Sequence, residues 1–177
     1  MAKPNAFSEM LSFKGRIGRG EWWLIAFGFS ILQAVVAFTL ATVLIGPENF
    51  GPSLRDHPIF HQIQLAMAVI LFWPILAASV KRAHDRNGPG FLPFVYMATN
   101  LALLAVQVLR PELFEMTVSD QPTGEVLALG LVGLATVVLA VWLLITLGFL
   151  PGQKGPNRYG PSPKGSGSRE YQAPQVD

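Results

Sequence analysis

Residues 126–150 read VLALGLVGLATVVLAVWLLITLGFL, a run of 25 residues without a formal charge. A helix of about 20 apolar residues is long enough to cross the hydrocarbon core of a bilayer. Core helices of soluble proteins are rarely apolar on every side over such a length. The stretch therefore predicts a membrane-spanning helix.

Three more stretches have the same character, at residues 22–45, 59–80 and 91–109, and none contains Asp, Glu, Lys or Arg. The first starts only after residue 21 and is longer than the apolar core of a signal peptide, which predicts a retained helix. We therefore expect an all-α integral membrane four-helix bundle over residues 22–150. Segments 1–21 and 151–177 flank it.

The composition supports a membrane protein. Of 177 residues, 51% are hydrophobic and 14% are charged, against about 25% charged residues in soluble domains. This balance excludes a disordered chain and argues against a water-soluble enzyme. The absence of cysteine excludes disulfides, thiolate catalysis and iron–sulfur clusters. His57 and His61 are four residues apart, but no carboxylate motif accompanies them, and we expect no metal and no other cofactor.

The net charge of +2 conceals a strong asymmetry. Residues 1–21, 81–90 and 151–177 hold eleven of the thirteen basic residues and five acidic ones, whereas the other two loops hold two basic and six acidic residues. Basic residues in short loops mark the cytoplasmic side of a membrane protein. Both termini are therefore predicted to be cytoplasmic.

The two terminal segments differ in pattern. Phe7, Met10, Leu11 and Lys14 recur at helical spacing, which predicts an amphipathic helix over residues 5–14 lying in the membrane interface; a frayed terminus is the alternative. Residues 151–177 contain five Pro and five Gly. This composition predicts a flexible cytoplasmic tail.

Few polar features occur inside the spans. Gln33 and Asn100 lie near the middle of the first and third spans, where their amides can bond across the bundle or contact a solute. Pro74 predicts a kink in the second span. No ionisable Asp, Glu, Lys or Arg lies inside a span, which argues against a proton- or ion-coupled transporter.

Three short clusters are predicted to meet at the cytoplasmic face. They are Arg16 and Arg19; Lys81, Arg82, His84 and Asp85 in the loop between the second and third spans; and Asn157, Arg158 and Tyr159 after the fourth. One interpretation is a structural network in which carboxylates neutralise arginines. The other is a pocket for an anionic lipid headgroup or a phosphate, which the planar donors of arginine suit. Either is compatible with a partner protein docking there.

The same residues carry a resemblance. FKGRIGR at 13–19 before Trp22 and Trp23, KRAHD at 81–85, and NRYG at 157–160 resemble the bacterial inner-membrane family called domain of unknown function 805, over residues 11–163. The family pattern has Arg and Leu where this chain has Lys81 and Ala83, and an aromatic pair where it has 91–92. The resemblance implies a divergent inner-membrane member with about four helices, and it implies no activity.

We therefore expect a non-enzymatic accessory, scaffold or regulatory component of the bacterial inner membrane. It would bind anionic lipid or a larger membrane complex through its basic face, or form a homo-oligomer. A small transporter or channel subunit, with Gln33, Asn100 and Pro74 along its path, is the main alternative. An enzyme using His84 and Asp85 as an acid–base pair is a third, although no nucleophile accompanies them. Nucleic-acid binding is not expected, because membrane topology explains most of the basic residues.

Overall fold

The computed structural model describes residues 10–47, 54, 57–114 and 121–163. Four long helices account for most of them: α2 (Arg19–Leu44), α3 (Pro58–Asp85), α4 (Phe91–Leu109) and α5 (Gly124–Leu143). The π-helical turn η4 (Leu144–Phe149) continues α5, and a 3-10 turn, η3 (Pro111–Leu113), follows α4. All four helices, with η4 counted as part of the last, are long and apolar enough to cross a membrane. The predicted all-α architecture with four spanning helices is confirmed.

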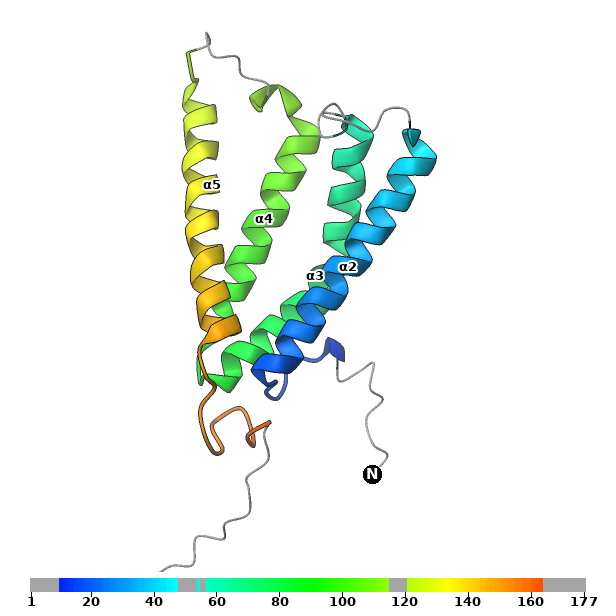
Figure 1. Ribbon diagram of the computed structural model, residues 1–177. Coiled ribbons are helices and arrows are strands. Elements are labelled where there is room, and N and C mark those ends of the chain that lie inside the picture. The colour runs from blue at the N-terminus through cyan, green and yellow to red at the C-terminus, as the bar shows by residue number, and fades with distance from the viewer. Residues whose placement is uncertain (1–9, 48–53, 55–56, 115–120, 164–177) are drawn as a thin grey trace, which may run out of the picture.

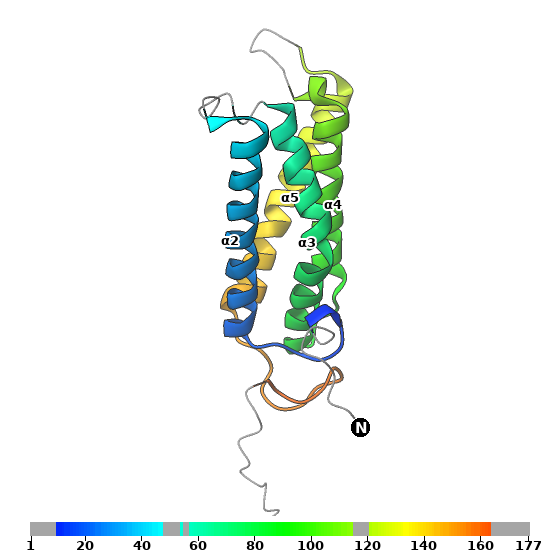
Figure 2. The same ribbon diagram turned by 90° about the vertical axis from the view of Figure 1, so that its right-hand side faces the viewer.

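Helix α3 is the centre of the arrangement. It packs against α2 on one side and α4 on the other, and α4 packs against α5, whereas α2 meets the fourth span at η4. In Figure 1, α2 and α5 lie closest together at the end where α2 contacts η4, and they diverge toward the other end. Figure 2 shows the same helices from the side. Helix α3 continues through Pro74 but changes direction along its length in Figure 1, as expected where a proline removes a backbone donor.

The seam between α2 and α3 forms the main apolar core. Ala37 and Ala41 of α2 are buried against Met67 and Leu71 of α3, together with Ile45 and Ile63 at one end. Small side chains on α2 bring the two backbones close, which is how helices gain packing contacts in lipid. This seam fixes α2 on α3 and leaves the outer faces of both helices exposed for contact with lipid.

Helix α3 extends five residues beyond its predicted end at 80. Lys81, Arg82, His84 and Asp85 were expected in a loop, and that expectation is wrong, because all four belong to the last turns of α3. Lys81 and Arg82 are buried there. Their polar groups find protein partners there, so the helix can continue past the apolar stretch. The turn then closes through Asn87 at φ +57° and through Gly88, whose N–H donates to the carbonyl of Ala83 over 2.9 Å.

The terminal segments lie against the same end of the bundle. Residues 5–9 of the predicted interfacial helix are outside the described part of the chain; Met10 and Leu11 are helical, and residues 12–14 are not. The Leu11 carbonyl accepts from Nε1 of Trp73 over 2.9 Å, and the Phe13 ring lies 4.8 Å from the Trp73 ring. Of the predicted flexible tail, residues 151–163 are described and contact this end, with the Gln153 N–H donating to the Asp85 carbonyl over 2.8 Å; residues 164–177 lie outside the described part of the chain.

Candidate functional site at the basic end

The three basic clusters meet at one end of the bundle. We call it the basic end, formed by residues 10–23, 79–90 and 144–163. Its described residues include two acidic side chains, Glu21 and Asp85, and eight basic ones: Lys14, Arg16, Arg19, Lys81, Arg82, Arg86, Lys154 and Arg158. The sequence therefore correctly placed distant segments on one surface. The contacts below show what each side chain does there.

Arg82 is buried over the whole residue. Its Nε donates to the carbonyl of Leu147 over 2.7 Å, and Nη2 donates to the carbonyl of Leu150 over 2.6 Å. Its Nη1 pairs with Oδ2 of Asp85, one turn further along α3. One guanidinium thus joins α3 to the end of the fourth span.

Five consecutive carbonyls at that helix end accept side-chain donors. Those of residues 146–150 accept, in order, from Arg86 at 2.8 Å, Arg82 at 2.7 Å, Trp23 at 3.0 Å, Arg19 at 2.9 Å and Arg82 at 2.6 Å. The last carbonyls of a helix lack partners within it and carry the negative end of the helix dipole. Arginine side chains supply four of these five donors and the Trp23 indole supplies the fifth.

Arg16 joins the N-terminal segment to the tail, and its side chain is fully buried. Its Nε and Nη2 donate to Oδ1 of Asp85 over 3.1 and 2.9 Å. Its remaining donors reach the carbonyls of Gln153 at 2.6 Å, Gly155 at 2.7 Å and Gly160 at 3.2 Å. Asp85 therefore lies between two guanidiniums, and its charge is compensated without solvent.

A glycine allows the tail to pass over Asp85. A Cβ at Gly152 would lie 1.8 Å from Oδ2 of Asp85, and the neighbouring Gln153 N–H donates to the Asp85 carbonyl over 2.8 Å. Sequence reasoning did not single out Gly152 or the carbonyls of 146–150. A signal for this close packing is the presence of glycine at positions 148 and 152, beside the end of the fourth span.

The NRYG segment docks on the end of α3. Nδ2 of Asn157 donates to the carbonyl of His84 over 2.9 Å, and its Oδ1 accepts from the Tyr159 N–H over 2.9 Å. The Tyr159 ring stacks on the His84 imidazole at 3.7 Å with 6° between the planes. Arg158 lies 4.7 Å from the Tyr159 ring and donates to the Asn87 carbonyl over 3.2 Å. All three NRYG side chains named as candidates therefore make structural contacts.

His84 and Asp85 act separately in this geometry. Neighbouring helix positions do not face one another, and the Asp85 carboxylate is taken by Arg16 and Arg82. Nδ1 of His84 is buried and has no hydrogen-bond partner within the described ranges. The contacts do not support an acid–base pair.

Four cations remain exposed around this network: Lys14, Arg19, Lys154 and Arg158. Lys81, by contrast, is buried, and its Nζ donates to the Met10 carbonyl over 3.4 Å. We call the four exposed side chains the cationic rim. The indole of Trp22 lies close by, with Nε1 donating to Oγ of Ser79 over 3.4 Å.

The family model described as protein of unknown function DUF805 matches residues 10–161, which includes every cluster of the basic end. The chain belongs to this family. It is also 31% identical over 153 residues to the uncharacterized protein YiiR of Escherichia coli strain K12, covering 85% of each chain, and equally similar to YiiR of E. coli O157:H7. No solved structure matches it. The DUF805 motifs thus coincide with the contacts that hold the helix ends together.

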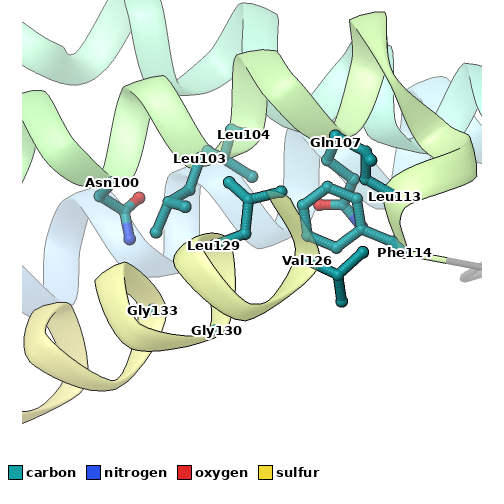
Figure 3. A pocket seen from close by; sticks show the side chains of 10 residues that line it. All are labelled: Asn100, Leu103, Leu104, Gln107, Leu113, Phe114, Val126, Leu129, Gly130 and Gly133. Atoms are coloured by element: carbon teal, nitrogen blue, oxygen red, sulfur yellow. The ribbon is translucent and has the colours of Figure 1, made fainter. Parts of the chain in front are cut away.

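The two amides inside the membrane do not meet. Nε2 of Gln33 donates to Oε1 of Gln64 over 3.4 Å between α2 and α3, whereas Asn100 lies in a cleft between α4 and α5 (Figure 3). The prediction that Gln33 and Asn100 bond across the bundle is wrong, because α3 lies between α2 and α4. Among the described residues, Gln33 lines a cleft between α2 and α3, and Asn100 lines a different one between α4 and α5.

The opposite end of this DUF805 protein carries exposed ion pairs. Arg110 contacts Glu112, and its Nη2 lies 3.4 Å from Oε2 of Glu125. The hydrogen bond from Arg110 lowers the pKa of Glu112, and the same bond raises the pKa of Arg110. These groups are solvent-exposed, and such pairs contribute little to stability. The buried pairs at the basic end are of a different kind.

Proposed function

We propose that this DUF805 protein is a non-enzymatic accessory component of a bacterial inner membrane whose basic end faces the cytoplasm and binds anionic lipid headgroups. The observation that carries the proposal is that the cations at the basic end fall into a buried group and an exposed group. Arg16 and Arg82 are buried and fully used by carbonyls and Asp85. The cationic rim is exposed around them.

The rim suits a lipid surface on physical grounds. A basic side chain close to an anionic leaflet contributes about 1 kcal/mol to its attraction, and four such side chains make a clear preference for anionic lipid. Trp22 and Trp23 lie near the start of α2, and tryptophan side chains favour the headgroup level. The exposed cations and the two tryptophans together support a position of the cationic rim at the level of the lipid phosphates.

A lipid-preference experiment tests the proposal. The quadruple variant Lys14→Gln, Arg19→Gln, Lys154→Gln and Arg158→Gln removes the rim. Quenching of tryptophan fluorescence by brominated phosphatidylglycerol, against brominated phosphatidylcholine, gives the relative association constant in reconstituted vesicles. We expect a preference of several-fold for the anionic lipid in the unmodified chain, and a ratio close to one in the variant. Arg110→Gln, which removes an exposed cation from the opposite end, serves as the matched control and leaves the preference unchanged.

The outcomes separate lipid from other ligands of the same face. An unchanged preference in the quadruple variant contradicts lipid binding by the rim. If a protein instead copurifies in mild detergent with the unmodified chain and not with the variant, while the lipid preference stays the same, a partner complex replaces lipid in the proposal.

The orientation has its own test, which the absence of cysteine makes simple. Lys154→Cys places a thiol at the basic end, and Gln121→Cys places one at the opposite end, both at exposed positions. An impermeant maleimide added to intact spheroplasts is expected to label the cysteine at 121 and to miss the one at 154 until the membrane is opened. The reverse pattern contradicts the orientation.

A further inference from the structure

The cleft between α4 and α5 contains a polar group that the chain leaves unused. Asn100 is at the tenth of the nineteen positions of α4, so its amide is at the middle of a membrane-spanning helix. Its side chain is exposed and makes no hydrogen bond to any residue in the described ranges. An amide without a partner is unfavourable in hydrocarbon. The cleft, of about 390 Å³, also contains the amide of Gln107.

Two glycines line the α5 side of the cleft, and packing within this chain does not require them. A Cβ at Gly130 or at Gly133 would meet no atom within 4 Å. At the basic end, by contrast, a Cβ at Gly148 would lie 2.7 Å from the Trp23 ring, so there a glycine is required by the fold. Glycine lowers the stability of a helix interior. The two cleft glycines therefore leave room that this chain does not itself fill.

We propose that the cleft is the contact surface for a second copy of this chain. Asn100, Leu103, Leu104 and Gln107 follow the i, i+3, i+4, i+7 pattern along one stripe of α4, the pattern by which helices pair over a long seam. Figure 3 shows this stripe and the glycines of α5 on the two sides of the cleft.

The hydrogen-bonding groups of the Asn100 amide indicate what occupies the cleft. An asparagine side chain offers both donors and an acceptor, so the same residue of a second copy is its complement. Lipid chains offer neither. Glycines on the facing wall let a helix approach closely, and interhelical amide bonds together with close packing drive association in bilayers. A second copy provides both without any other molecule. This proposal is independent of lipid binding at the basic end.

Energy transfer between labelled chains in vesicles tests it. A cysteine at the exposed position Gln62, outside the cleft, accepts donor or acceptor dye in the otherwise cysteine-free chain. Transfer is measured over a series of protein-to-lipid ratios to obtain a dissociation constant. Asn100→Leu is expected to weaken association by roughly 3- to 30-fold, the effect of one interhelical hydrogen bond in a membrane, and Asn100→Gln is expected to restore part of it.

Gly133→Leu is the second variant and does not depend on the amide. Its Cβ has open space in the single chain, so the helix tolerates it, but the larger side chain fills the cleft and is expected to abolish association. Gly28→Leu, on α2 and equally unobstructed, is the matched control and leaves the dissociation constant unchanged.

Three results overturn the proposal. The first is energy transfer that never exceeds the level of randomly distributed monomers. The second is association that Asn100→Leu and Gly133→Leu leave unchanged. The third is a monomer that retains a lipid in native mass spectrometry and loses it on Asn100→Leu, which assigns the cleft to lipid instead.

Discussion

Removal of the Arg82 guanidinium is the perturbation with the clearest expected effect. In Arg82→Ala the carbonyls of Leu147 and Leu150 lose donors at 2.7 and 2.6 Å, and Asp85 loses one of its two guanidinium partners. Arg82 is buried, so solvent does not replace these bonds without opening the basic end.

The magnitude follows from these three losses. Breaking a buried ion pair by removing one partner costs about 3–5 kcal/mol, and each buried carbonyl left without a donor costs about 1–3 kcal/mol. Asp85 keeps Arg16 as a partner, which places the ionic part at the lower end, and water entering the new cavity offsets part of the carbonyl loss. We expect the free energy of unfolding to fall by about 3–5 kcal/mol.

Unfolding in mixed micelles with rising SDS, followed by tryptophan fluorescence, gives this free energy. Arg82→Lys keeps the charge but cannot reach all three acceptors, and we expect about half the loss. Arg19→Gln is the matched control, because it removes a single exposed bond to the Phe149 carbonyl; its expected cost is below about 1 kcal/mol. The reasoning is refuted if Arg82→Ala stays within about 1 kcal/mol of the unmodified chain, or if it costs no more than the control.

Three further predictions concern the same end. Gly148→Ala puts a Cβ 2.7 Å from the ring of a tryptophan on α2 and is expected to lower the free energy of unfolding by about 1–3 kcal/mol. Gly28→Ala has open space around its Cβ and is expected to leave this free energy unchanged. Equal losses for the two variants in SDS unfolding would contradict the prediction. Gly152→Ala meets the Asp85 carboxylate at 1.8 Å and is expected to release the tail, which faster tryptic cleavage after position 154 would reveal; an unchanged rate would show that the tail is held elsewhere. Tyr159→Ala removes the ring stack, worth about 1 kcal/mol, and is expected to speed the same cleavage about fivefold while leaving the unfolding free energy of the helices unchanged.

The spans were predictable because the bilayer imposes a simple rule. Apolar length alone identifies 22–45, 59–80, 91–109 and 126–150, and the described helices cover them with shifts of a few residues except at the end of α3. That end was missed because a charge usually marks the end of a span. Lys81 and Arg82 are instead buried by protein, and only the three-dimensional arrangement shows that donors and acceptors are available there.

The candidate site was predictable in its location and less so in its chemistry. Topology places the three clusters on one face, and the structure brings Arg16, Arg82, Asp85 and Asn157 together there. Sequence could not reveal that most arginine donors point at backbone carbonyls, because carbonyls leave no signature in side-chain identity. The same reason hid the distinction between the buried arginines and the cationic rim.

The central claim is that the buried Arg16 and Arg82 use their donors within the network at the helix ends, while Arg19 and Arg158, each bonded to one backbone carbonyl, stay exposed and meet anionic lipid. Solid-state NMR of the protein in phosphatidylglycerol bilayers measures it directly, through the dipolar coupling between guanidinium ¹⁵N and lipid ³¹P, with single arginine variants assigning each signal. The account predicts coupling to phosphate at Arg19 and Arg158 and none at Arg16 or Arg82. Phosphate coupling at Arg82, or its absence at Arg19 and Arg158, would contradict it.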